Sequence, residues 1–287
     1  HSVRIALGVS YLGTNYHGWQ SQLDGLTIQD KLEAALNTFA NTTPTLTPER
    51  RIHTLCAGRT DSGVHGHMQV VHLDTEVVRD ESSWVRGTNA NLPKDIAVQW
   101  ARVVPREFHC RGSALTRRYA YALLESNVRP SLDARRVGWS HRPLDASAMR
   151  LAANFLLGEH DFSSFRAAQC QALSPVKQLL RIDIASRGER VMHGGLGDDL
   201  HPQGQRYWRF EFEGNAFLHH MIRNIMGCLL MVGDGRQSPE WILEVLAKRD
   251  RDAAAPTFSP DGLYFLGPVY PSQWGIPTKT AAFDWLP

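Results

Sequence analysis

The residues best suited to chemistry lie in one nine-residue stretch, GRTDSGVHG, at positions 58–66. It contains three glycines and a single acid, Asp61, with Arg59 two residues before it. A nearby guanidinium favours the ionised form of a carboxylate, and glycines let a ligand approach the backbone closely. The pattern therefore indicates an ionised acid presented to a ligand. The alternative is a hairpin turn capped by Asp61 and Ser62, and the local sequence leaves both open.

The elements that must position this stretch are strands. Apolar and β-branched residues occupy 51–56 on one side and 68–73 on the other, and both runs predict strands. The acid is therefore expected on a loop held by a sheet.

The rest of the first half predicts an alternation of strands and helices. Thr27 and Asp30 have the spacing of a capping box, which predicts a helix beginning there. Further elements are expected as a strand over 3–9, a polar and aromatic loop over 11–20, a helix over 81–90 and a strand over 96–103. The resulting order, β-α-β-β-α-β, is typical of a ferredoxin-like half.

The second half repeats this order loosely. Asp145 is expected to cap a helix, and 158–166 reads as a turn-rich loop. Strands are expected over 117–124, 176–184, 207–212 and 263–270, and helices over 215–232 and 239–248. The sequence thus predicts an α+β fold of two ferredoxin-like halves, with residues 1–108 carrying the acidic loop and 109–287 forming the second half.

Histidines and an arginine on the predicted 215–232 helix form a second candidate group. His219 and Arg223 are four residues apart and would share a helix face. Arg223 could turn inward to a carboxylate such as Asp61, or remain a surface arginine with an apolar stem.

Two other arrangements suggest metal or nucleophilic chemistry only weakly. The pairs His219-His220 and His65-Gly66-His67 lack the helical spacing and the cysteines typical of zinc sites, so no metal is predicted. Ser62 near His65 has no GxSxG elbow around it, which disfavours a serine nucleophile.

Composition and charge bound the class of protein. The chain has 287 residues, of which 43% are hydrophobic and 21% are charged. This length and apolar content suffice for the cores of two lobes. The net charge is only +2, yet residues 106–150 hold nine arginines, no lysine and four acids. This segment predicts either a phosphate-binding surface or an ordinarily solvated one.

Cysteine usage and hydropathy point to the cytoplasm. The four cysteines are far apart and form no CxxC pair, which favours reduced thiols. The apolar runs are too short to span a bilayer, and no secretory signal is visible.

Six motifs together resemble one family, the tRNA pseudouridine(38–40) synthases known as TruA. The match runs in order from residue 5 to about 270, and its motifs are YLGTNYHGWQ, GRTDSGVHG, RRYAY, GEHDFSSFR, NAFLHHMIRNIMG and PDGLYFLGPVY. The resemblance implies that Asp61 is the catalytic aspartate, with Arg59 beside it in an RNA-binding cleft. It further implies that Tyr119 lies under the target uracil, Arg223 forms a salt bridge with Asp61, and Leu263 provides an apolar wall.

The resemblance also sets expectations for the whole molecule. The family fold is a two-lobed antiparallel sheet flanked by helices, with tRNA in a central basic cleft. His65, Arg117 and Arg118 complete the expected substrate-binding set, although a strand tyrosine such as Tyr119 can equally pack in a core. A cytoplasmic homodimer without cofactor or metal is expected. Ser186–Arg206 is longer than the connection usual in bacterial members.

Two other classes of function remain as alternatives. One is a non-catalytic protein of the same fold that binds structured RNA, against which the intact set of Asp61, Arg59, Tyr119 and Arg223 argues. The other is a metal-dependent hydrolase that uses the histidines, which lack ligand spacing.

Overall fold

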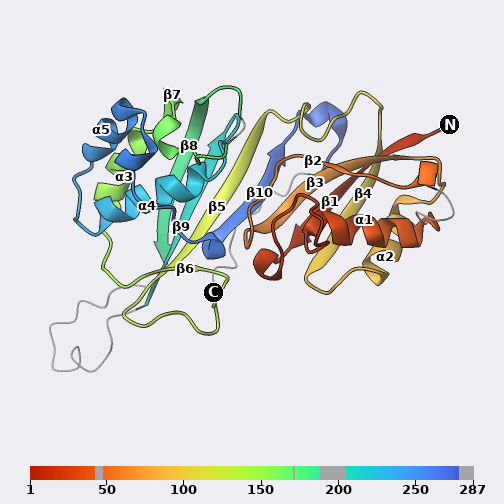
Figure 1. The fold of residues 1–287 in the computed structure, drawn as a ribbon, viewed down its shortest axis with the longest axis horizontal. Helices are drawn as coiled ribbons and strands as arrows, with labels where there is room; N and C mark the ends of the chain where they lie inside the picture. Colours follow the sequence, from red (N-terminus) through yellow and green to blue (C-terminus); the bar gives the residue numbers. More distant parts are fainter. Residues whose placement is uncertain (43–47, 171, 188–204, 278–287) are drawn as a thin grey trace. The chain divides into compact units, whose positions relative to one another are not determined.

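The computed structural model describes residues 1–42, 48–170, 172–187 and 205–277. These residues form two compact units. Figure 1 draws them as a ribbon coloured by position along the sequence. The first unit contains residues 1–117 and 264–277, and the second contains 118–263. Most of the long connection predicted at 186–206 lies outside the described residues.

The first unit is built on an antiparallel sheet. Its strand order is β4 (Ile96–Val104), β1 (Val3–Tyr11), β3 (His65–Thr75), and both neighbouring pairs are antiparallel. The two-residue strand β2 (Leu55–Cys56) pairs with the later part of β3. Strand β10 (Leu263–Val269) pairs in parallel with the start of β3, where Tyr264 lies opposite His65.

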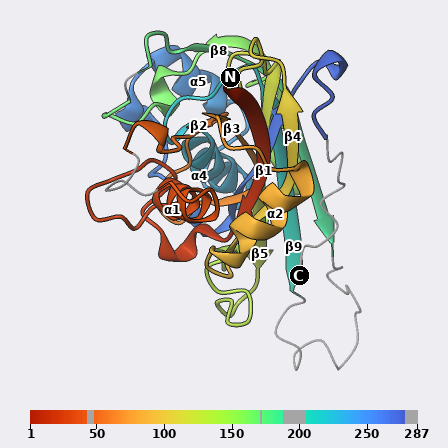
Figure 2. The same cartoon turned by 90° about the vertical axis from the view of Figure 1, so that its right-hand side faces the viewer.

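Two helices pack on this sheet and on each other, α1 (Ile28–Phe39) and α2 (Glu81–Ala90) (Figure 2). Each begins where a side chain caps it: Thr27 accepts a hydrogen bond from the Asp30 amide, and Asp80 accepts one from the Ser83 amide. The element order β1-α1-β2-β3-α2-β4, with the strands in spatial order 4-1-3-2, confirms the predicted ferredoxin-like half.

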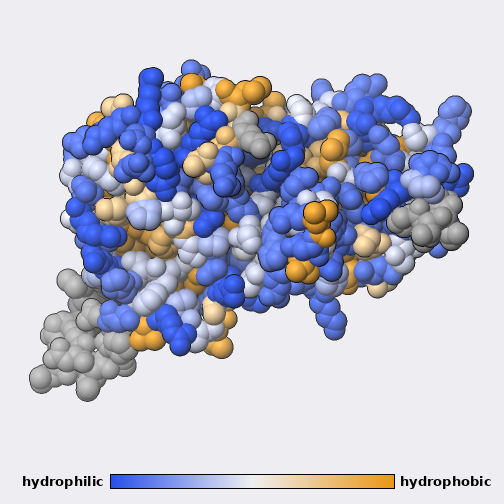
Figure 3. Space-filling view, in the orientation of Figure 1, coloured by the Kyte–Doolittle hydropathy of each residue, from blue (hydrophilic) through white to orange (hydrophobic). Residues whose placement is uncertain are grey.

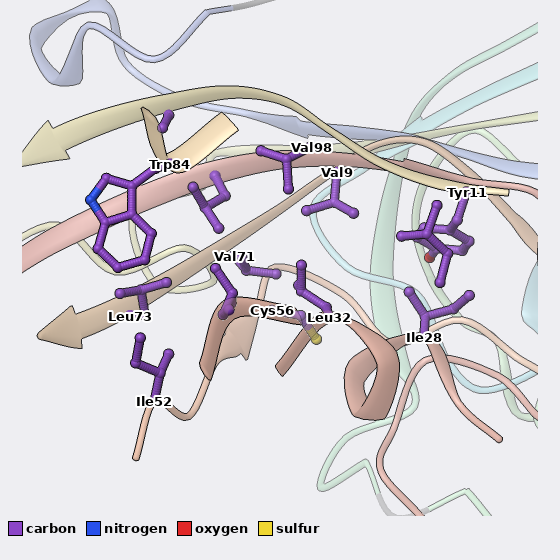
Figure 4. Close-up of a cluster of buried hydrophobic side chains, with 14 of the residues drawn as sticks. Val9, Tyr11, Ile28, Leu32, Ile52, Cys56, Val71, Leu73, Trp84 and Val98 are labelled. Atoms are coloured by element: carbon purple, nitrogen blue, oxygen red, sulfur yellow. The ribbon is translucent and has the colours of Figure 1, made fainter. Parts of the chain in front are cut away.

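The core of this unit lies between the sheet and the two helices (Figure 4). Leu32 of α1 and Trp84 of α2 are almost fully buried, as are Val71 and Leu73 of β3. Burial of aromatic and branched side chains is the main stabilising contribution here. The core thereby makes β3 a rigid support for the loop that precedes it.

The second unit has the strand order β5-β9-β8-β7, with β6 parallel to β5. The pairs β9-β8 and β8-β7 are antiparallel. The strands are β5 (Thr116–Glu125), β6 (Gly138–Ser140), β7 (Gly158–Asp161), β8 (Val176–Arg187) and β9 (Arg206–Gly214). Its helices are α3 (Ala146–Asn154), α4 (Met221–Gly233) and α5 (Trp241–Lys248), the first capped by Asp145 as predicted.

The prediction of a helix over 215–232 was wrong at its start. Helix α4 begins at Met221, because His220 has a left-handed backbone with φ of 63° that cannot continue a helix. Asn215 instead bonds the Gln178 amide, which holds the start of the segment against β8. His219 therefore does not lie on the helix, and the four-residue face shared with Arg223 does not exist.

Smaller differences concern short strands. The strand predicted over 51–56 is reduced to Leu55–Cys56, and the loop predicted over 158–166 contains β7 and a single 3₁₀ turn, Ser163–Phe165. Strand β6 was not predicted. Pairing with a neighbouring strand decides such short elements, since their own sequence pattern is too brief to carry a period.

The surface seen in Figure 3 is mostly hydrophilic, with hydrophobic residues in small separate patches. Among the described residues, every helix is too short or too polar to cross a membrane.

Candidate active site

The candidate acid lies on a tight loop that leads directly into β3. Asp61 is partly exposed, while Arg59 and Ser62 on the same loop are exposed. The Asp61 carbonyl accepts a hydrogen bond of 3.0 Å from the Val64 amide, closing a turn in which Gly63 has φ of 80°. The turn is therefore one that glycine favours, and it leaves the carboxylate of Asp61 at the surface of the first unit.

The segment 11–20 holds this loop, although the two are some fifty residues apart in sequence. The Trp19 amide donates to the Thr60 carbonyl at 3.0 Å, and the Gly63 amide donates to the Tyr16 carbonyl at 3.3 Å. The Tyr11 and Thr60 hydroxyls share a hydrogen bond of 2.8 Å. The motifs YLGTNYHGWQ and GRTDSGVHG thus form one structure.

Glycines at two positions make this close packing possible. A Cβ on Gly13 would lie 1.9 Å from the Val64 carbonyl oxygen, so a side chain cannot fit there. Gly18 has φ of 82°, and a Cβ on it would lie 2.8 Å from the Thr60 oxygen. Only glycine allows the two backbones to approach at these points.

Gln69 fixes the beginning of the loop from within the sheet. Its side chain is fully buried on β3. Its amide nitrogen donates to the Gly58 carbonyl at 2.5 Å, and its amide oxygen accepts from the Gly58 amide at 3.4 Å. Both backbone groups of Gly58 are therefore bonded to one side chain.

His65 serves the loop as an acceptor. Its Nδ1 accepts a hydrogen bond of 2.9 Å from the Gly13 amide, and its ring lies 4.6 Å from that of Tyr264. An accepting Nδ1 places the proton of the neutral ring on Nε2. Since the residue is only 1% exposed, this geometry favours a positioning role over direct contact with a substrate.

The other residues expected at the site belong to the second unit. Tyr119 is partly exposed on β5, and its ring meets that of Phe217 edge-on at 5.0 Å. Arg223 donates from Nε to the Phe258 carbonyl at 2.7 Å. Leu263 is 5% exposed. The predicted pairing of Asp61 with Arg223 joins residues of the two units and stays a prediction.

The two arginines at the start of β5 have different surroundings. Arg117 donates to the Arg111 carbonyl at 2.8 Å and is partly exposed. Arg118 lies 3.9 Å from the carboxylate of Glu211, which also pairs with Arg181 at 3.2 Å. These contacts favour a structural role for Arg118 within the sheet.

A cluster of His72, His109 and Cys110 has the composition of a metal site but the wrong proton arrangement. Their possible ligand atoms lie within 4.8 Å of one another. Nδ1 of His72 accepts from the Cys110 amide at 3.1 Å, and Nδ1 of His109 accepts from the Arg111 and Gly112 amides. Each neutral ring then carries its proton on Nε2, which leaves that nitrogen no lone pair for a metal. Burial also raises the pKa of the Cys110 thiol to about 12.

Three residues of the loop support were missed from the sequence: Tyr11, Thr60 and Gln69. The available signal for Gln69 was its place among the apolar residues of the strand predicted over 68–73, because a buried polar side chain needs a partner. No comparable signal marks Tyr11 or Thr60, since each hydroxyl finds the other across the fold.

Comparison with known proteins bears on the whole chain. The family model described as tRNA pseudouridine synthase matches residues 8–111 and 152–271. Relatives named tRNA pseudouridine synthase A are 64% identical in Polaromonas sp. (strain JS666 / ATCC BAA-500) and 62% identical in Acidovorax sp. (strain JS42). Each alignment covers 99% of this chain and 100% of the relative.

Likeness to solved structures is weak by contrast. The archaeal box H/ACA sRNP Nop10-Cbf5 complex matches with a TM-score of 0.31 and 11% identity, over 87% of this chain and 60% of that one. A score this low supports no argument, so the assignment depends on the sequence matches. On those matches, the chain belongs to the tRNA pseudouridine synthase family.

Proposed function

We propose that this protein isomerises uridine to pseudouridine in the anticodon stem-loop of tRNA, at positions 38–40, with Asp61 as the essential carboxylate. One observation carries the proposal. Asp61 is the only acid of the 58–66 loop, and its side chain is partly exposed while Gly58, Thr60 and Gly63 beside it are hydrogen-bonded to other segments. A loop held this firmly around one accessible acid suits a reaction that needs an aimed carboxylate.

The reaction balances without any added group. The bond between ribose C1′ and uracil N1 breaks, the base turns over, and a bond forms between C1′ and C5. The proton on C5 is lost and N1 gains one, so there is no net oxidation. An ionised Asp61 serves either as the nucleophile or as the base that removes a proton, and both roles need the same carboxylate.

The target uracil must leave its stack before it can react. Unstacking costs about a few kcal/mol, which contacts with the displaced base and with phosphates offset. In this proposal Tyr119 stacks on the uracil and Leu263 provides an apolar wall. Arg59 and Arg117 contact the RNA backbone. The enzyme acts as a homodimer in the cytoplasm.

Replacement of the carboxylate tests the function directly. We expect Asp61→Asn to abolish pseudouridine formation in unmodified tRNA, measured with EDTA present, and to leave the Kd for tRNA within about threefold, because phosphate contacts dominate affinity. Asp80→Asn is the matched control, since it changes an exposed acid at the α2 cap where asparagine caps equally well.

Two outcomes would overturn the proposal. Full turnover by Asp61→Asn, shown by mass spectrometry to be free of deamidation, would remove Asp61 from catalysis. A wild-type protein that binds tRNA but forms no pseudouridine would instead support the non-catalytic RNA binder.

A further inference from the structure

Thr60, the residue immediately before Asp61, forms hydrogen bonds through two of its oxygen atoms, the backbone carbonyl and the side-chain hydroxyl. Its carbonyl accepts from the Trp19 amide, and its hydroxyl shares the 2.8 Å hydrogen bond with the hydroxyl of Tyr11. Thr60 is 7% exposed and Tyr11 is 4% exposed. The hydroxyl pair is therefore buried, and loss of either hydroxyl removes a buried hydrogen bond from the other.

The sheet and the neighbouring rings hold Tyr11 in place. It ends β1, where its backbone lies opposite Gly66 of β3. Its ring occupies the space where a side chain at Gly66 would lie, and the nearest ring carbon is 2.4 Å from an ideal Cβ there. The Trp19 ring packs against it at a centroid distance of 5.7 Å. These contacts hold the Tyr11 side chain in place, and its hydroxyl in turn holds Thr60.

We propose that the Tyr11–Thr60 hydroxyl pair positions Asp61 for catalysis, so that Tyr11 and Thr60 are positioning residues that set the rate without binding tRNA. The inference rests on the proposed function. Asp61 follows Thr60 directly, so a rotation of the Thr60 peptide moves the Asp61 carboxylate. A misplacement of about 1 Å at a reacting group can cost on the order of 100-fold in rate.

Four variants and one control test the pair. Thr60→Val and Tyr11→Phe each remove one hydroxyl with little change of shape, and the double variant removes both. Thr60→Ser keeps the hydroxyl and removes only the methyl group. Thr42→Val is the matched control. Thr42 is 2% exposed in the same unit, lies outside both the 11–20 and the 58–66 segments, and bonds Asn37 at 2.6 Å. The measurements are the single-turnover rate at saturating tRNA, the Kd for tRNA, and Tm.

We expect each hydroxyl-deleting variant to lower the single-turnover rate at least about tenfold while the Kd changes less than about threefold. The double variant should be no slower than the slower single variant, because the two groups act as one unit. Thr60→Ser should recover most of the rate. Thr42→Val should melt at a lower temperature, like Thr60→Val, and keep the wild-type rate.

The proposal fails if Thr60→Val and Tyr11→Phe match Thr42→Val in rate, or if their rate losses multiply in the double variant. If Thr60→Val does not fold, Tyr11→Phe and Thr60→Ser decide the matter by the same criteria. Wild-type protein assayed beside them separates this inference from the proposed function, since an inactive wild type refutes the latter.

Discussion

At the scale of single residues, the loop depends on small groups in contact with large ones. Gly66 is the clearest case, since the Tyr11 ring fills the space beside its Cα. The same contact that excludes a side chain at Gly66 holds Tyr11 against Thr60. Stability and the geometry of the candidate site therefore depend on one close approach.

Gly66→Ala is expected to destabilise the protein and to slow catalysis together. The added methyl group must displace the Tyr11 ring, and overpacking of this kind costs about 1–3 kcal/mol. Urea unfolding and the single-turnover rate measure the two effects. Gly112→Ala is the control, since its nearest contact would be an ordinary 3.7 Å and its stability should be unchanged. A stable, fully active Gly66→Ala protein would contradict the packing described here.

His72 gives the first unit a predictable dependence on pH. Burial, together with the positive charge of Arg4 and the neighbouring His109, lowers the pKa of His72 to about 4 from 6.5, while Asp74 opposes the shift. The unfolded chain therefore binds the proton more tightly. The contribution of neutral His72 to the free energy of unfolding is therefore fully present above pH 6.5. It is lost as the pH falls from 6.5 toward 4, by at most about 3 kcal/mol.

The measurement is the free energy of unfolding between pH 4 and 7. His72→Gln should be less stable at pH 7 but should lose less stability on acidification than the wild type. Equal slopes in His72→Gln and the wild type would show that other groups cause the acid sensitivity.

At the scale of elements, helix α4 ties Arg223 to the segment before β10. The Arg223 Nε donates to the Phe258 carbonyl at 2.7 Å, and the Phe258 amide donates back to the Arg223 carbonyl at 3.2 Å. Only the first of these bonds uses the side chain. A substitution at Arg223 therefore leaves the backbone bond between the helix and this segment in place.

We expect Arg223→Ala to reduce the single-turnover rate by about tenfold or more while Tm changes little. Arg223→Lys should recover the rate only in part. Lysine restores a charge but not the planar fork that can bond two groups at once. If Arg223 supports the ionised form of Asp61, the rate of the alanine variant should recover as the pH rises, because loss of a counter-charge raises a carboxylate pKa. Near-normal activity of Arg223→Ala at neutral pH would leave Arg223 with a structural role alone.

At the scale of the whole molecule, the net charge of +2 hides an uneven distribution. Of the nine arginines in 106–150, Arg106, Arg111, Arg129, Arg135, Arg136, Arg142 and Arg150 are exposed. Arg118 is instead paired within the sheet. A basic segment with this exposure fits a ligand made of phosphates.

Binding of tRNA should weaken steeply between about 50 and 200 mM salt, because arginine–phosphate contacts release counterions. Arg117→Ala should make the slope of log K against log salt shallower by about one unit. Arg118→Ala should lower Tm instead, through loss of its contact with Glu211. Arg79→Ala, outside the segment, should change neither binding nor its salt dependence. A flat salt dependence of the wild type would exclude a phosphate-dominated interface.

The sequence by itself determined the elements whose signals are local. The Thr27 and Asp145 caps marked two helix starts, because capping involves residues within a few positions of one another. The runs predicted over 3–9, 81–90 and 96–103 agree with β1, α2 and β4 to within two residues. The order of these elements sufficed for the ferredoxin-like half. The choice of Asp61 came from a motif, in which residue types and spacing alone carry the information.

Tertiary structure decided the features that depend on distant partners. Helix α4 begins at Met221 because His220 is left-handed, although apolar residues at 217 and 218 continue the helical stripe in sequence. The Tyr11–Thr60 contact pairs two side chains that nothing in their own segments marks as partners. A hydrogen bond between residues fifty positions apart forms only once the sheet has set its register, and sequence periodicity carries no record of that register.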